Sequence, residues 1–373
     1  MAKKLGEMAF NRGAINWFPG HMAAATRAIK ERLKLADLVL EVRDARIPLS
    51  SANADLQSIL SQKRRIIVLN KKDLTNSNLI QKWTQHFDQH KHCSHFAHAH
   101  NKNNINKLLV QVEAQLKEAI SRQPTLLVMV IGIPNVGKSA LINSLYQISR
   151  IRFPAQEKLK RATVGPLPGV TQDIAGFKIA NRPSIYVLDT PGILVPNIPD
   201  IDTGLKLSLT GAIKDSIVGE DRVAQYLLAI LNTHRIPLHW KDLESKGHED
   251  SAHMFSEGRT GDGSEVSPHQ KKKKKNVKSN RMINTEDHTI EVKKALFRTF
   301  SGFEGNLENE DDLEHLIESQ LIALQKAFRV PPNSGEVGRN KVSKKLVHLY
   351  RIGNLGHYIL DSIPNGTSRG AIV

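Results

Sequence analysis

The sequence has very little cysteine and no long apolar run. Among its 373 residues there is one cysteine, Cys93, so no disulfide framework can form within the chain, and a reducing compartment is the simple interpretation. No apolar stretch approaches the ~20 residues that a bilayer-spanning helix needs. The N-terminus, MAKKLGEMAFNRGAINWF, has no apolar core of the signal-peptide kind. It is mildly basic, which is only a weak signal for import into an organelle.

Acidic residues are scarce relative to basic ones. The chain has 53 lysines and arginines against 37 acidic residues, a net charge of +16 and a pI near 9.8. This excess favours a polyanionic partner, either nucleic acid or an anionic membrane face, and we favour nucleic acid over a merely basic soluble protein. Hydrophobic residues make up 40% of the chain, enough to bury a core, and the length suggests two domains or one domain with appendages.

Short apolar runs alternate with helical patterns in the first part of the chain. Buried strands are predicted at 36–44, 64–70, 126–132 and 184–192. Helices are predicted at 22–35 and 103–120, where apolar residues recur on one face. This alternation predicts an α/β fold with a doubly wound, mostly parallel sheet.

The segment GIPNVGKS, residues 132–139, fits the phosphate-loop pattern G-x-x-x-x-G-K-[ST]. Gly132 and Gly137 let the backbone wrap closely, so that its N–H groups point at phosphate oxygens. Lys138 supplies charge to the β- and γ-phosphates, and the hydroxyl of Ser139 can ligate Mg²⁺. The predicted nucleotide contacts in and just after this loop are Asn135, Val136, Gly137, Lys138, Ser139 and Ala140.

Two further motifs belong to the same chemistry. DTPG ends a predicted strand, and we expect Asp189 to hold Mg²⁺ and the N–H of Gly192 to meet a γ-phosphate and sense hydrolysis. PGVTQD, at 168–173, lies between the phosphate loop and DTPG. Its Thr171 is the expected second hydroxyl on Mg²⁺, with Thr163 as the competing candidate.

The segment NKKD, made of Asn70, Lys71, Lys72 and Asp73, follows the apolar run RRIIVL and has the form of a guanine-reading loop. Asp73 can accept both donors on the guanine edge, whereas adenine offers no such pair and would leave the carboxylate unmatched. Asn70 can reach the other edge of the base and tie down the phosphate loop, and the stem of Lys71 can lie over the base plane. The alternative is that NKKD is an ordinary turn at the end of a strand. The presence of the other nucleotide-binding motifs argues against this alternative.

The order of these motifs is unusual, because the base-reading loop precedes the phosphate loop. A circular permutation gives this order. The original N- and C-termini of a conventional GTP-binding domain are joined, and new termini are made after the half of the sheet that carries DTPG. A sheet tolerates such a cut, because its contacts survive when the termini move to a surface loop. The new ends then adjoin the switch region, which suits a switch that drives an added domain.

At this point the sequence resembles the circularly permuted YlqF/RbgA-type ribosome-assembly GTPases. WFPGHM (17–22), DARIP (44–48), NKKD, GIPNVGKS, PGVT, DTPGIL and TGLKLSLTGAIKD (203–215) match that group at matching spacing. The late segment YRIGNLGHYILD resembles the mitochondrial GTPase 1 branch, in a fungal form. The resemblance implies a GTPase that uses Mg²⁺ and assists late assembly of the large ribosomal subunit, bound to its rRNA. For the mitochondrial branch it implies the matrix side of the inner membrane.

The expected organisation combines this domain with a helical one. We predict an N-terminal tail at 1–15, the permuted GTPase domain at 16–202, a helical domain at 203–361 and a tail at 362–373. A low-complexity insert at 245–288 interrupts the helical domain, and it is either a tether for RNA or membrane or a solvated loop. In the helical domain one apolar stripe is predicted, formed by Leu313, Leu316, Ile317, Leu321, Leu324 and Phe328.

The residue that activates water is not where Ras-type GTPases have it. Their water-orienting glutamine follows DxxG, and here that position is Ile193, which cannot orient water. His21 in WFPGHM is the candidate, which the resemblance supports, and a structural histidine near a helix start is the alternative. Asn135 resembles the asparagine with which some GTPases recruit K⁺, an ion that can do an arginine finger's electrostatic work.

The loop that closes the base pocket is not clear from the sequence. HFAHAHNK, at 95–102, lies in the right place, so His98 and Ala99 are the predicted base contacts. The histidines at 86–100 have no convincing metal-ligand spacing.

Two functions remain open. The first is an assembly factor for the large subunit of the mitochondrial ribosome, and the second is a GTP-regulated, membrane-associated signalling or trafficking protein that uses the lysine run at 271–275. No second catalytic constellation supports GTP-driven RNA modification.

Overall fold

The computed structural model describes residues 21–120, 125–152, 176–181, 184–193, 198, 200–244 and 276–364. By internal contacts the chain divides into two compact units, one formed mainly by residues 6–219 and 356–373 and the other mainly by 220–355. We call them the sheet unit and the helical unit. Each is described by itself.

The sheet unit alternates strands and helices along the chain. Its strands are β1 (Leu38–Asp44), β2 (Arg65–Asn70), β3 (Cys93–Phe96), β4 (Thr125–Ile131), β5 (Gly176–Asn181) and β6 (Ser184–Leu188). Its helices are α2 (His21–Leu33), α3 (Gln57–Leu60), α4 (Ser77–Gln89), α5 (Lys102–Ile120), α6 (Lys138–Arg152), α7 (Ile201–Leu209) and α8 (Asp215–Val218), with 3₁₀ turns η1 (Ala54–Leu56) and η2 (Lys72–Leu74).

The strands form one sheet in the order β3-β2-β1-β4-β6-β5. The first five are parallel to their neighbours, and only β5 runs antiparallel, against β6. The predicted α/β fold with a mostly parallel sheet is therefore confirmed. The four predicted strands correspond to β1, β2, β4 and β6. The prediction missed β3, because three of its four residues are only partly buried. It also missed β5, which pairs only with β6.

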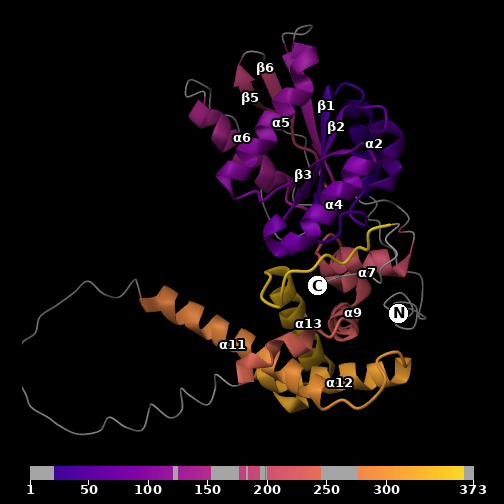
Figure 1. The fold of residues 1–373 in the computed structure, drawn as a ribbon, viewed down its shortest axis with the longest axis vertical. Coiled ribbons are helices and arrows are strands. Elements are labelled where there is room, and N and C mark those ends of the chain that lie inside the picture. Colours follow the sequence, from indigo (N-terminus) through magenta and orange to yellow (C-terminus); the bar gives the residue numbers. More distant parts are fainter. Residues whose placement is uncertain are drawn as a thin grey trace, which may run out of the picture. The chain divides into compact units, whose positions relative to one another are not determined.

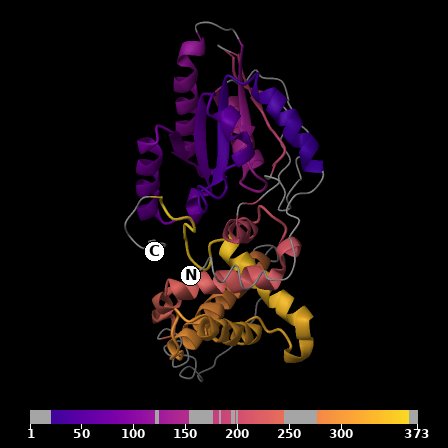
Figure 2. The same ribbon diagram turned by 90° about the vertical axis from the view of Figure 1, so that its right-hand side faces the viewer.

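Helices cover both faces of this sheet (Figures 1 and 2). On one face, Ile29 and Leu33 of α2 pack with Val39 of β1 and with Met129 and Ile131 of β4. The side chains of α4 pack further along the same face, on Ile67 and Leu69 of β2. Helices α5 and α6 contact each other and the strands on the opposite face. Because helices cover both faces of the sheet, the central strand β1 is buried along its whole length.

The helical unit contains α9 (Glu220–Thr233), η3 (Ile236–Trp240), α11 (Asn276–Ser301), α12 (Glu310–Ala327), η5 (Pro332–Ser334) and α13 (Gly335–Arg351). Helix α9 packs on α13, and α11 packs on α12. All six residues of the stripe predicted along α12 are buried, so that periodicity is confirmed. Asn309 caps the start of α12 by accepting from the backbone N–H groups of Asp311 and Asp312.

The boundaries differ from those predicted at 203 and 361. Helices α7 and α8 belong to the sheet unit, as does the segment from Gly356 (yellow in Figure 1). The reason is a buried anchor: Asp361 accepts from the N–H groups of Leu49 and Ser50 at 2.8 and 2.9 Å and from the Ser50 hydroxyl at 2.6 Å. It also pairs with Lys206 of α7 at 3.4 Å. The contacts of this C-terminal segment join residues far apart in sequence, so local sequence patterns cannot show to which unit the segment belongs.

The predicted insert at 245–288 also differs at its end. Helix α11 begins at Asn276, whereas the insert was predicted to run to 288. The composition of residues 276–288 is polar, but extending an existing helix adds one hydrogen bond for each residue fixed. Residues 245–275, with the lysine run, lie outside the described part of the chain.

We predict that the core of the helical unit depends on a reciprocal amide pair. Asn232 of α9 and Gln320 of α12, both fully buried, exchange two hydrogen bonds of 2.8 Å. Gln320→Leu leaves the Asn232 amide buried without its partner and should lower the free energy of unfolding by about 1–3 kcal/mol, measured by urea unfolding followed by circular dichroism. Adding Asn232→Leu should recover part of that loss.

The exposed Glu314→Gln of the same helix is the matched control and should leave the unfolding free energy almost unchanged. Strictly additive losses in the double variant would contradict the pairing.

Candidate functional site

The carboxyl edge of the sheet brings the predicted nucleotide loops together. Strands β1 and β2 are in register, with Asp44 opposite Asn70 at their last residues. Strand β4 pairs with the other side of β1, with Ile131 opposite Glu41. Because parallel strands end at the same edge, NKKD and the phosphate loop both emerge beside the end of β1.

A direct hydrogen bond joins the base-reading loop to the phosphate loop. The side-chain Nδ2 of Asn70 donates to the carbonyl oxygen of Val136 at 2.9 Å. Gly137, at φ +89°, leaves room for this contact, since a Cβ there would stand 2.3 Å from the same nitrogen. A larger residue at 137 would therefore separate the two loops.

The NKKD loop is held open toward solvent. Lys71 adopts a left-handed backbone conformation (φ 63°), and the N–H of Lys72 donates to the carbonyl of Ala97 at 3.0 Å. The Asp73 side chain remains 41% exposed, so its carboxylate is accessible to a base.

The two predicted base contacts after β3 lie beside this loop. The imidazole Nε2 of His98 is 3.8 Å from Asp73 Oδ1, and Ala99 is buried. The loop is fixed by Asn104, which the sequence analysis did not identify. Its Oδ1 accepts from the N–H of His98 at 2.8 Å, and its Nδ2 donates to the Phe96 carbonyl at 3.1 Å.

A cavity adjoins both loops. Ala99 and His100, from the segment after β3, line one side of it. Ala140, which follows the phosphate loop, lines another. Side chains on one face of α6 form another wall. Its volume is about 760 Å³, within the range of ligand pockets. Two predicted contacts that lie 41 residues apart in sequence thus share one cavity.

The phosphate-loop lysine is buried beside an acidic partner. Lys138 Nζ donates to the carbonyl of Ile133 at 2.8 Å. Burial lowers the pKa of Lys138 to about 8, although the nearby Asp189 opposes this shift. Burial also raises the pKa of Asp189, which Lys138 opposes. Both pKa shifts arise because little water reaches these two side chains. Further partners would stabilise their charged forms.

The Asp189 carboxylate has the features of a magnesium ligand. Its Oδ2 lies 3.4 Å from the Ser139 hydroxyl. Its Oδ1 is buried with no hydrogen-bond partner among the described residues. A buried carboxylate and a hydroxyl are hard oxygen donors of the kind that Mg²⁺ prefers, so these residues fit the ion. Thr171 and its competitor Thr163 lie outside the described residues.

The DTPG turn approaches the phosphate loop closely. A Cβ on Gly192 would lie 2.6 Å from Pro134 Cα and 3.0 Å from Lys138 Nζ. Glycine is therefore the residue that lets this backbone reach the phosphate loop, as expected for a γ-phosphate sensor.

Comparison with known proteins agrees with this arrangement. The family model described as "50S ribosome-binding GTPase" matches residues 127–255. The chain is 58% identical to Short integuments 2, mitochondrial, of Arabidopsis thaliana over 362 residues, covering 96% of this chain and 93% of that protein. It is 39% identical to Ribosome biogenesis GTPase A of Bacillus pumilus, over 58% of this chain and 75% of that protein.

The chain belongs to the circularly permuted ribosome-biogenesis GTPases of the YlqF/RbgA type. The predicted family and GTPase activity are thereby confirmed. It is also 38% identical to Mitochondrial ribosome-associated GTPase 1 of Bos taurus, over 60% of this chain and 68% of that protein. The near full-length match is to a plant protein, and the expected fungal form is not what these comparisons show.

The position after DTPG is part of the core of this GTPase. Ile193 is buried in the cluster formed by α2, β1 and β4, and its carbonyl accepts from Asn53 Nδ2 at 3.2 Å. It therefore has no access to attacking water. The candidate His21 is the first residue of α2. Since α2 runs antiparallel to β1, which follows it, His21 lies toward the carboxyl edge of the sheet.

Asn135 of the phosphate loop binds a distant segment. Its Nδ2 donates to the Gly211 carbonyl at 2.8 Å, in the turn that follows α7. Its backbone is left-handed, with φ 58°. The motif TGLKLSLTGAIKD thus contacts the phosphate loop, which the sequence analysis did not predict.

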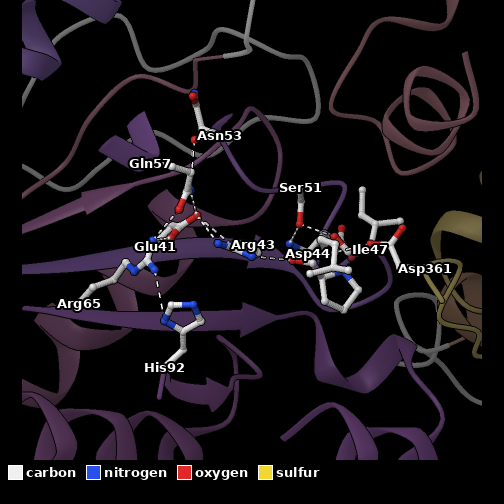
Figure 3. Close-up of polar contacts among 12 residues, drawn as sticks. Glu41, Arg43, Asp44, Ile47, Ser51, Asn53, Gln57, Arg65, His92 and Asp361 are labelled. Atoms are coloured by element: carbon white, nitrogen blue, oxygen red, sulfur yellow. Dashed lines mark hydrogen bonds and ion pairs between the residues drawn. The ribbon is translucent and has the colours of Figure 1, made fainter. Parts of the chain in front are cut away.

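The strand β1 carries two buried carboxylates that the sequence analysis also did not assign. Figure 3 shows Glu41 with Arg43 and Arg65, at 2.8 and 3.0 Å. Asp44 lies further along the same strand and binds Arg46 at 2.8 Å and Lys71 at 2.9 Å. Burial alone would raise the pKa of Asp44, but Arg46 and Lys71 hold it well below its usual range. The available sequence signal was a pair of acidic residues, Glu41 and Asp44, in an otherwise mostly apolar strand.

We predict that Asp73→Asn changes the base preference of this GTPase. An asparagine amide no longer accepts both guanine donors, but its N–H₂ can donate to the 2-oxo group that xanthine has in place of the guanine amino group. GDP affinity should fall at least about a hundredfold and XDP should become the better ligand, measured by fluorescent-nucleotide titration. Retained GDP preference would contradict the assignment of NKKD as the base-reading loop.

We predict that nucleotide binding takes up a proton near pH 8. Lys138, with a pKa lowered to about 8, loses its proton as the pH rises through that value, and nearby phosphates should restore it. Calorimetric titration of GDP at pH 8, in buffers of different ionisation enthalpy, should give an uptake of roughly half a proton per nucleotide. Lys138→Arg, whose guanidinium stays protonated, should bind without that uptake. Equal uptake in both proteins would assign the proton to another group.

Proposed function

We propose that this GTPase is an assembly factor for the large subunit of the mitochondrial ribosome. It binds the subunit's rRNA in the GTP state and is released after hydrolysis. The observation that carries the proposal is the 58% sequence identity, over 96% of the chain, to a mitochondrial protein of the ribosome-biogenesis GTPase family. The name of the bovine relative, Mitochondrial ribosome-associated GTPase 1, points to the same partner.

The charge of the chain supports a polyanionic partner. A net charge of +16 attracts rRNA from a distance and strengthens contacts to its phosphates. In the described part of the chain no helix is long and apolar enough to cross a bilayer. We place the protein in the mitochondrial matrix, with peripheral contact to the inner membrane.

Guanine nucleotide occupies the site formed by NKKD and the phosphate loop. Asp73 pairs with the guanine edge, Asn70 fastens the base loop to Val136, and His98 and Ala99 flank the base. Lys138 and the loop N–H groups bind the phosphates, while Ser139, Asp189 and Thr171 hold Mg²⁺. This ion supplies positive charge that offsets the negative charge developing on the phosphates.

His21 orients the attacking water. The buried Ile193 leaves this task to a residue from elsewhere, and His21 begins the helix that packs against Ile193. Its role is to position water rather than to act as a strong base. Docking on the subunit orders the switches and brings His21 to the γ-phosphate.

K⁺ assists at Asn135. Asn135 lies in the phosphate loop, where its side-chain Nδ2 donates to the Gly211 carbonyl. The ion then offsets negative charge in the transition state as an arginine finger does. Equal turnover in Na⁺ and K⁺ would count against this part of the proposal.

We predict that purified large mitochondrial ribosomal subunits stimulate GTP turnover in K⁺ buffer, and that His21→Ala abolishes the stimulation. Removing a water-orienting group should cost at least about a hundredfold in the stimulated rate, measured by phosphate release. GDP affinity should not change, because His21 acts on water.

The matched control is His90→Ala. His90 follows the last residue of α4, near the amino edge of the sheet, where β3 begins, so its loss should leave the stimulation intact. If the subunit neither binds nor stimulates the enzyme, the assembly role is wrong. Binding to anionic vesicles that depends on residues 245–288 would then favour the membrane-associated alternative.

A further inference from the structure

We propose that Asp44 is a positioning residue for guanine recognition, which acts by holding Lys71 of the base-reading loop in place. Arg46 completes the device by joining the same carboxylate to the turn that binds the phosphate loop. The proposal rests on the role of NKKD proposed above. It assigns a role to Asp44-Ala45-Arg46, the DAR triplet, which does not belong to any of the nucleotide-binding motifs described above.

The Asp44 carboxylate is built into the end of the central strand. Its side chain is 2% exposed. Oδ1 accepts from the Arg46 backbone N–H and from Arg46 Nε, both at 3.0 Å. Oδ2 accepts from Arg46 Nη2 at 2.8 Å and lies 2.9 Å from Lys71 Nζ. One buried negative charge is thus shared by two cations.

Lys71 needs such an anchor. Its backbone is left-handed, with φ 63° and ψ 36°, a conformation that a non-glycine residue holds only where its surroundings enforce it. The ion pair with Asp44 fixes the far end of the side chain, which is 24% exposed. The methylene stem between these two fixed ends offers an apolar surface against which a planar base can lie.

Arg46 extends this support to the phosphate loop. Its Nη2 donates to the Thr210 carbonyl at 3.4 Å, and the next carbonyl, that of Gly211, accepts from Asn135 Nδ2 at 2.8 Å. The base-reading loop and the phosphate loop are therefore joined twice, once through Asn70 and Val136 and once through Asp44, Arg46 and the Thr210–Gly211 turn.

The test is a double-mutant cycle between Asp44 and Lys71 in the full chain. GDP affinity and dissociation rate are measured with a fluorescent nucleotide for Asp44→Asn, Lys71→Met and the double variant. Each single substitution should raise the dissociation constant roughly tenfold, the scale of one charge-assisted hydrogen bond. The double variant should be only slightly weaker than Lys71→Met, far less than additive losses would make it, because Asp44 acts mainly through Lys71 and only in part through Arg46.

Two controls separate positioning from folding. Glu41→Gln changes another buried carboxylate of β1, which binds Arg43 and Arg65 rather than the base-reading loop. It should lower thermal stability and leave GDP affinity unchanged. Lys71→Arg keeps the pair with Asp44 and should retain most of the affinity. Additive losses in the cycle, or an equal loss of affinity in Glu41→Gln, would overturn the proposal.

The proposal stays testable if Asp44→Asn does not fold. Lys71 lies partly at the surface, so Lys71→Met should fold, and it should speed amide hydrogen exchange across residues 70–74. Unchanged affinity and exchange in Lys71→Met would refute the anchor. If Asp73→Asn removes GDP binding while Lys71→Met does not, only this proposal fails. If neither substitution matters, the role of NKKD as base-reading loop fails as well.

Discussion

The parallel register of β2, β1 and β4 is the constraint on which the nucleotide site depends. Asp44 pairs with Asn70 on one side of β1, and Glu41 pairs with Ile131 on the other. This pairing delivers the DAR triplet, the NKKD loop and the phosphate loop to a single edge. Shifting either neighbour by one residue would reverse the face of every side chain in that strand. The core and the site are therefore set by the same pairing.

The permuted chain order leaves this geometry intact, because a sheet is held by neighbouring strands and not by the order in which they are made. Strands β4 and β6, which carry the phosphate loop and DTPG, come late in the chain, but β4 lies next to β1 and β6 lies next to β4. The chain leaves the sheet unit at Gly219 and returns at Gly356. The return is secured by Asp361, which binds Ser50 just after the DARIP segment.

Buried charges form three groups in the sheet unit, two of them at the loops of the nucleotide site. Glu41 and Asp44 lie on one strand and each binds two cations, but they serve different places. Glu41 stabilises the interior of the sheet with Arg43 and Arg65, whereas Asp44 reaches Lys71 at the edge. Lys138 and Asp189 form a third buried group, whose shifted pKa values reflect the scarcity of water there. Buried charge of this kind is costly unless it is paired, which explains why Glu41 and Asp44 each have two cationic partners.

The sequence by itself determined four of the six described strands, the α/β class, the apolar stripe of α12 and the motif of each nucleotide loop. These depend on periodicity and on residues close together in the chain, and a local pattern records them directly. Only the tertiary structure decided that Asn70 binds Val136, that Asp44 holds Lys71 and that Asn135 binds Gly211. It also decided that α7, α8 and the segment around Asp361 belong to the sheet unit. Each of those results requires groups from distant segments to meet, and where they meet is fixed by strand pairing and core packing, which no local pattern specifies.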